Sequence, residues 1–147
     1  MQNFVELIKD HVQITIAVDE LTAVTRHPKS RPTAAYEALR RLAHLLDAHL
    51  RAEEEFLSED RNAGREEFTL LANEHGAMFD DLVCEWGIYL GEWDQENIAC
   101  DWEHFATATD WIATRLHEQV DAENRSLYPA ALHYGLVRLL PEKVSAA

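Results

Sequence analysis

The chain has 147 residues, of which 47% are hydrophobic and 27% are charged, and its formal net charge is −14. Length and composition are ordinary for one globular domain with a continuous core, so residues 1–147 are treated as a single domain. The negative charge argues against nucleic-acid binding, which needs clustered lysine and arginine. No apolar run approaches the roughly eighteen residues of a membrane span. Residues 1–10 have the pattern of an amphipathic helix rather than a signal peptide, so we expect a cytoplasmic protein that binds no membrane.

The first half of the chain shows two long stretches with helical periodicity. One helix is expected from about Phe4 to Thr25, because two prolines occur within residues 26–32. Thr33 is expected to cap a second helix that ends near Leu57. The segment from Ser58 to Arg65 contains an Asn-Ala-Gly sequence and is predicted to be a turn.

The second half shows the same periodicity twice more. A third helix is expected from about Glu66 to Leu90, ending at Gly91. Asp94 is expected to cap a fourth helix, which ends where Pro129 or Gly135 intervenes. Long helices joined by short connections favour antiparallel neighbours. The predicted fold class is therefore all-α: an up-down-up-down antiparallel four-helix bundle.

The pair His49 and Glu53 is the most informative feature of the expected second helix. A spacing of four places both side chains on one helix face, and the same face carries Leu42 and Leu46. Both side chains should therefore point into the core. Burying an imidazole beside an ionised carboxylate is unfavourable by several kcal/mol unless something compensates them, and a metal ion would do so.

Two further histidines occupy apolar helix faces. His11 shares its face with Leu7 and Ile14, and His75 lies between Ala72 and Phe79. A single histidine in such a position is usually a core residue bonded to a backbone carbonyl or to water. Three of them on three expected helices, one with a glutamate at the next turn, favour a metal site. Imidazole together with carboxylate suits iron, zinc and manganese.

Four motifs follow one another along the four expected helices: Asp10-His11, His49-Leu50-Arg51-Ala52-Glu53, Glu74-His75 and Glu123-Asn124-Arg125-Ser126-Leu127-Tyr128-Pro129. With this ordered set the chain resembles the hemerythrin-like family, also called HHE cation-binding domains, over nearly its whole length. The resemblance implies a hemerythrin-like four-helix bundle that holds a non-haem di-iron centre.

The same resemblance implies the ligand set. His11, His49 and His75 would be terminal iron ligands, and Glu53 and Glu123 would bridge the two ions together with an oxo or hydroxo group. One position would stay open for oxygen, nitric oxide or peroxide.

The fourth helix departs from the family pattern, which places a histidine four or five residues before the acidic ligand. Gln119 stands four residues before Glu123, and the nearest histidine, His117, stands six before it and four before Asp121. At roughly 100° per residue, Glu123 lies close to the apolar stripe of this helix and Asp121 lies far from it. Glu123 is therefore the better carboxylate. A π-bulge between Leu116 and Glu123 would bring His117 to the metal as well.

Three functions remain open at this point. The first is a di-iron protein that binds or senses oxygen, nitric oxide or iron. The second is a di-iron enzyme that reduces peroxide or nitric oxide or delivers iron for cluster repair. The third is a metal-free or single-metal interaction bundle. A metal- or gas-binding role is favoured over an enzymatic one, with a small gas or peroxide as ligand. We expect a sensor's output to pass through a homo-oligomer or an unidentified protein partner.

Overall fold

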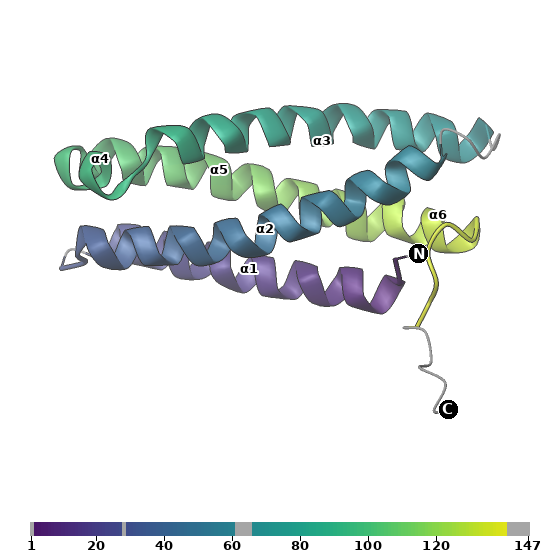
Figure 1. Ribbon diagram of the computed structural model, residues 1–147, viewed down its shortest axis with the longest axis horizontal. Helices are drawn as coiled ribbons and strands as arrows, with labels where there is room; N and C mark the ends of the chain where they lie inside the picture. Colours follow the sequence, from purple (N-terminus) through teal and green to yellow (C-terminus); the bar gives the residue numbers. More distant parts are fainter. Residues whose placement is uncertain (1, 28, 61–65, 141–147) are drawn as a thin grey trace.

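The protein is an antiparallel bundle of long helices, shown as a computed structural model in Figure 1, and the structure describes residues 2–27, 29–60 and 66–140. The long helices are α1 (Phe4–Arg26), α2 (Pro32–Asp60), α3 (Glu66–Glu92) and α5 (Trp102–Ala122). Both α1 and α3 pack against α2 and α5. The all-α antiparallel bundle predicted from the sequence is confirmed. None of the helices, within the described residues, is long and apolar enough to cross a bilayer.

Helix α2 begins earlier and ends later than predicted. It starts at Pro32, so Thr33 lies inside the first turn instead of capping the helix. Proline suits this first position because its fixed φ is helical and the amide hydrogen it lacks would have no helical partner there. The helix also continues past Leu57 to Asp60. Residues 61–65 of the predicted turn lie outside the described residues.

The connection after α3 differs from the prediction as well. Helix α3 runs through Gly91 to Glu92, since a glycine lowers helix stability without ending a well-packed helix. Asp94 caps a helix as predicted, because its side chain accepts a hydrogen bond from the Asn97 amide. That helix is short, however: α4 comprises Gln95–Cys100.

Asp101 divides the predicted fourth helix in two. Its backbone leaves the helical conformation, with φ −144° and ψ 68°, and its side chain accepts a hydrogen bond from the His104 amide at 3.3 Å. Helix α5 therefore begins with its own N-cap, and α4 forms the turn at the left end of the bundle in Figure 1.

The chain remains helical beyond α5 through a change of helix type. A π-helical turn, η1 (Glu123–Leu127), leads directly into α6 (Tyr128–His133). Pro129 cannot donate a backbone hydrogen bond, and its ring would clash with a carbonyl one α-turn earlier. The wider π-turn just before it avoids this conflict. The helical path ends near Gly135, which has a φ of 74°.

Two apolar clusters form the core. The larger one contains Ile14, Leu46 and Leu116, and the smaller one, next to α6, contains Leu7 and Leu127. Helix α1 contributes residues to both clusters. The continuous segment formed by α5 and η1 does the same. The residues between these contributions, around His11 and Glu123, therefore form a polar layer between two apolar ones.

Asp101→Ala should destabilise the protein by about 1 kcal/mol, because the first turn of α5 loses its capping acceptor. Asp101→Ser should retain most of the stability, since serine caps a helix about as well as aspartate. Urea unfolding measures both. Equal losses in the two variants would instead assign the effect to the exposed ion pair between Asp101 and His104.

Candidate metal centre

Four side chains from three elements converge in the polar layer, and we call them the ligand cluster: His11, His49, Glu53 and Glu123. One nitrogen or carboxylate oxygen from each lies within 4.8 Å of the others. None of the four residues is more than 3% exposed. The cluster joins α1, α2 and η1, so it forms only when these elements pack together.

The contacts within the ligand cluster are short. His49 Nε2 lies 2.8 Å from Glu53 Oε1, as the spacing of four on α2 predicts. His11 Nε2 lies 2.9 Å from Glu123 Oε1 and 3.0 Å from His49 Nε2. Both imidazoles therefore direct the same nitrogen, Nε2, toward one point.

The Nδ1 nitrogens of the two imidazoles, which point away from the cluster, are also hydrogen-bonded. His11 Nδ1 lies 2.6 Å from Asn124 Oδ1, and His49 Nδ1 lies 3.2 Å from Asp10 Oδ2. When the ring is neutral, as it is when a metal binds it, an oxygen acceptor at Nδ1 holds the hydrogen there and leaves the lone pair on Nε2. Metal-binding histidines usually have such an outer partner, which fixes ring orientation and tautomer. The sequence contained both partners next to predicted ligands but did not reveal their role.

The carboxylates hold protons on the imidazoles of the isolated chain. Burial lowers the pKa of His11, but hydrogen bonds and charge from Glu123 and Glu53 outweigh it and raise the pKa to about 9. The same balance raises the pKa of His49 to about 10. Burial also raises the pKa of Glu123, helped by the charge of Glu53. For Glu53, burial is outweighed by hydrogen bonds from Glu123 and the two imidazoles, and its pKa falls below the usual range.

Within the part of the chain that the structure describes, three buried atoms near this layer have no hydrogen-bond partner: Glu53 Oε2, Gln119 Oε1 and His75 Nδ1. The two oxygens are acceptors by chemistry. Ser126 Oγ donates to the Ala122 carbonyl and lies 2.9 Å from His75 Nε2, so the ring hydrogen belongs on Nε2 and Nδ1 is left bare. Unsatisfied buried acceptors are unfavourable, and a cation satisfies them. The donor set present therefore fits a metal ion that prefers nitrogen and oxygen ligands.

His75 lies on α3, buried as the sequence predicted, but it is not one of the four side chains in the ligand cluster. Burial lowers its pKa, although the charges of Glu123 and Glu74 act in the other direction. The ring is therefore neutral at pH 7 and keeps a lone pair available for a metal.

The fourth helix brings Gln119 and Glu123, and not His117, to the centre. Gln119 is buried and donates through Nε2 to Glu123 Oε2 at 2.8 Å. His117 instead lies near the surface, 3.3 Å from Asp19. A π-turn between Leu116 and Glu123 would have brought His117 inward, but the π-turn in the structure begins at Glu123 and leaves His117 outside. Asp121 is exposed, as the angular argument predicted.

Sequence reasoning overlooked Tyr128. Its side chain is fully buried, and its hydroxyl contacts all four members of the ligand cluster. The π-turn produces this position, because it aligns residues five apart: the Tyr128 amide donates to the Glu123 carbonyl. The proline that follows was the available signal, since it disfavours a regular α-turn at this point.

A small cavity adjoins the ligand cluster and is bounded on its other sides by apolar residues such as Leu46 and Leu82. Its volume is about 10 Å³ for the centre of a water molecule. This is roughly the space of one water molecule. The cavity beside the ligand cluster therefore has room for about one water molecule.

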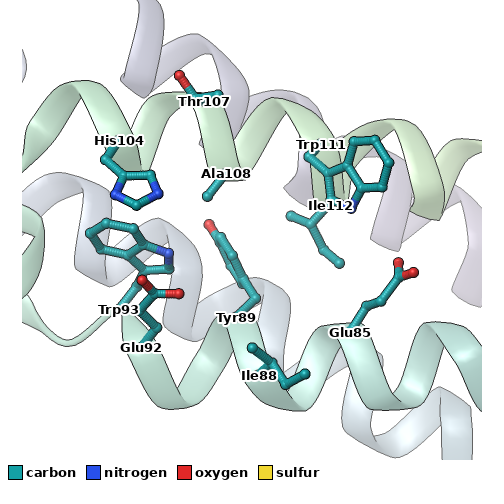
Figure 2. A pocket seen from close by; sticks show the side chains of 10 residues that line it. All are labelled: Glu85, Ile88, Tyr89, Glu92, Trp93, His104, Thr107, Ala108, Trp111 and Ile112. Carbon is teal, nitrogen blue, oxygen red and sulfur yellow. The ribbon is translucent and has the colours of Figure 1, made fainter.

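A larger groove lies elsewhere, between α3 and α5, and Figure 2 shows the side chains that line it. It has a volume of about 390 Å³ and includes the aromatic residues Tyr89 and Trp111. Its buried hydroxyl, on Tyr89, is already bonded to Thr109, and Glu85 is paired with Arg115. None of the residues that line the groove belongs to the ligand cluster. Because the Tyr89 hydroxyl and the Glu85 carboxylate are already paired, the groove offers no comparable set of ligand atoms.

Comparison with known protein families matches residues 3–131 to the Hemerythrin family, described as the Hemerythrin HHE cation binding domain. This range covers most of the chain and contains the whole ligand cluster. The chain belongs to the hemerythrin HHE cation-binding family. Searches of curated proteins and of solved structures gave no significant match.

The melting temperature of the chelator-treated protein should fall as pH rises. The two imidazoles have an ordinary pKa of 6.5, raised to about 9 for His11 and about 10 for His49 in the folded chain. Their stabilising contribution is thus complete below about pH 6.5 and lost as pH rises through about 9 to 10. Thermal melts at a series of pH values between these limits measure the fall in melting temperature. His11→Gln/His49→Gln should flatten the slope, and an unchanged slope would show that other groups cause it.

Proposed function

We propose that this protein is a non-haem iron protein that binds or senses oxygen, nitric oxide or iron through a di-iron centre in the polar layer. The observation that carries the proposal is the buried ligand cluster, in which two imidazoles with fixed tautomers and two carboxylates face one point. In the isolated chain, protons on the imidazoles balance the negative charges of the two carboxylates. A bound iron ion would balance the same charges. Membership of a cation-binding family supports this proposal.

The first ion would be held by the four side chains of the ligand cluster. The second would use lone pairs that have no partner in the structure, Glu53 Oε2 and His75 Nδ1. Glu53 and His75 would then help to hold the second ion. Gln119 holds Glu123 in place by donating to Oε2.

Bound iron would supply a redox-active Lewis acid to which a small ligand can attach. The chain itself provides selection by size. The ligand cluster is almost inaccessible to solvent, and the adjoining cavity has a volume of about 10 Å³ for a water centre. An enclosed site of this size favours a small ligand, such as a gas, over an organic substrate.

Metal analysis after iron loading tests the proposal most directly. The wild-type protein should retain two iron ions per chain after desalting. Glu123→Ala should lose at least one of them, because it removes a buried ligand from the cluster. Asp121→Ala is the matched control on the same helix: its side chain is exposed, and it should retain the wild-type iron content.

Greater iron loss from Asp121→Ala than from Glu123→Ala would overturn the assignment of the fourth-helix ligand. A wild-type chain that retains no iron would overturn the proposed function itself.

Gln119→His should tighten iron binding. Gln119 is buried at the layer, four residues before Glu123, and its Oε1 has no partner. An imidazole there would add a nitrogen ligand on the same helix face. Iron retention against a graded series of chelator concentrations measures the change. His117→Ala, on the surface side of α5, should leave retention unchanged; a loss there would place His117 at the metal after all.

A further inference from the structure

We propose that Tyr128 is itself an iron ligand, through its phenol oxygen. This inference rests on the proposed function, since it assigns a ligand to the same iron site. It concerns the ion held by the ligand cluster: His11, His49, Glu53 and Glu123.

The Tyr128 hydroxyl oxygen lies where the cluster's ligand atoms converge. It is 2.9 Å from His11 Nε2, 3.0 Å from His49 Nε2 and 3.3 Å from Glu123 Oε1. It also hydrogen-bonds to Glu53 Oε1. An ion bound by all four side chains must therefore occupy space next to this oxygen. Either the oxygen binds the ion or the whole ring moves away.

Packing argues against displacement of the ring. Tyr128 is completely buried, and its ring stacks on the His11 imidazole with centroids 4.8 Å apart and planes at 21°. It belongs to the smaller apolar cluster together with Phe68 and Leu127. The hydroxyl could leave the centre only if this cluster opened. The structure therefore presents the oxygen to the ion as a fixed group.

Tyr128 also supplies a ligand that the neighbouring residues of α5 do not provide. Gln119 occupies the expected histidine position, but its side-chain nitrogen donates to Glu123 and is not a ligand. His117 is paired at the surface with Asp19. Tyr128 thus supplies the additional ligand from this helix. On binding, the phenol O–H bond breaks, the proton leaves to solvent, and the oxygen–iron bond forms without any change of oxidation state.

The test uses the full chain loaded with ferric iron. A phenolate bound to ferric iron absorbs visible light by charge transfer from the ring, so the wild-type protein should be coloured. Resonance Raman excitation within that band should show phenolate ring vibrations. Tyr128→Phe should abolish the band while retaining iron. Tyr36→Phe, which removes a hydroxyl from α2 outside the ligand cluster, should keep the band unchanged.

The outcomes separate the two proposals. A wild-type protein that binds iron without a tyrosine-derived band, or a band that survives in Tyr128→Phe, overturns the inference and leaves the proposed function standing. Failure of the wild-type chain to bind iron overturns the proposed function. If Tyr128→Phe does not fold, the Raman spectrum of wild-type protein made with ring-deuterated tyrosine decides: shifted vibrations support the inference, and their absence overturns it.

Discussion

The need to balance a group of electron-rich atoms in an apolar interior is the constraint on which this structure depends. Two carboxylates, two imidazoles and a phenol form one connected group of polar contacts, and each is almost wholly buried. Without positive charge this arrangement would be strongly unfavourable. Protons on the imidazoles supply it in the isolated chain, as their raised pKa values show. A metal ion would supply it more completely and would release those protons.

Two kinds of helix bring the polar side chains of the centre together. A regular α-helix presents His49 and Glu53 together, because residues four apart share a face. On the last long helix the α-period alone would separate Glu123 from Tyr128 by about 140°. The π-turn brings them to the same point, and π-turns often occur at functional sites for this reason. A local change of helix type thus completes the centre.

The position of the centre limits what can reach it. It lies between two apolar clusters, and the adjoining cavity is about the size of one water molecule. Apolar surroundings strengthen electrostatic interactions among the ligands and keep bulk water away. The orientation of each imidazole is fixed separately, by a hydrogen bond between its Nδ1 and Asn124 or Asp10. Such a site is suited to holding a metal firmly while admitting only small molecules.

The sequence by itself determined the helical class, the antiparallel order and the inward positions of His11, His49, Glu53, His75 and Glu123. The helical class and the inward positions follow from a regular period of 3.6 residues, which relates side chains on one helix. The antiparallel order follows from the short connections between long helices. Only the tertiary structure decided that His117 faces Asp19, that Asp101 splits the last segment, and that Tyr128 enters the centre. Each of these depends on a cap, a π-turn or a neighbouring helix. Helical periodicity contains no information about such departures, so they could not be predicted from it.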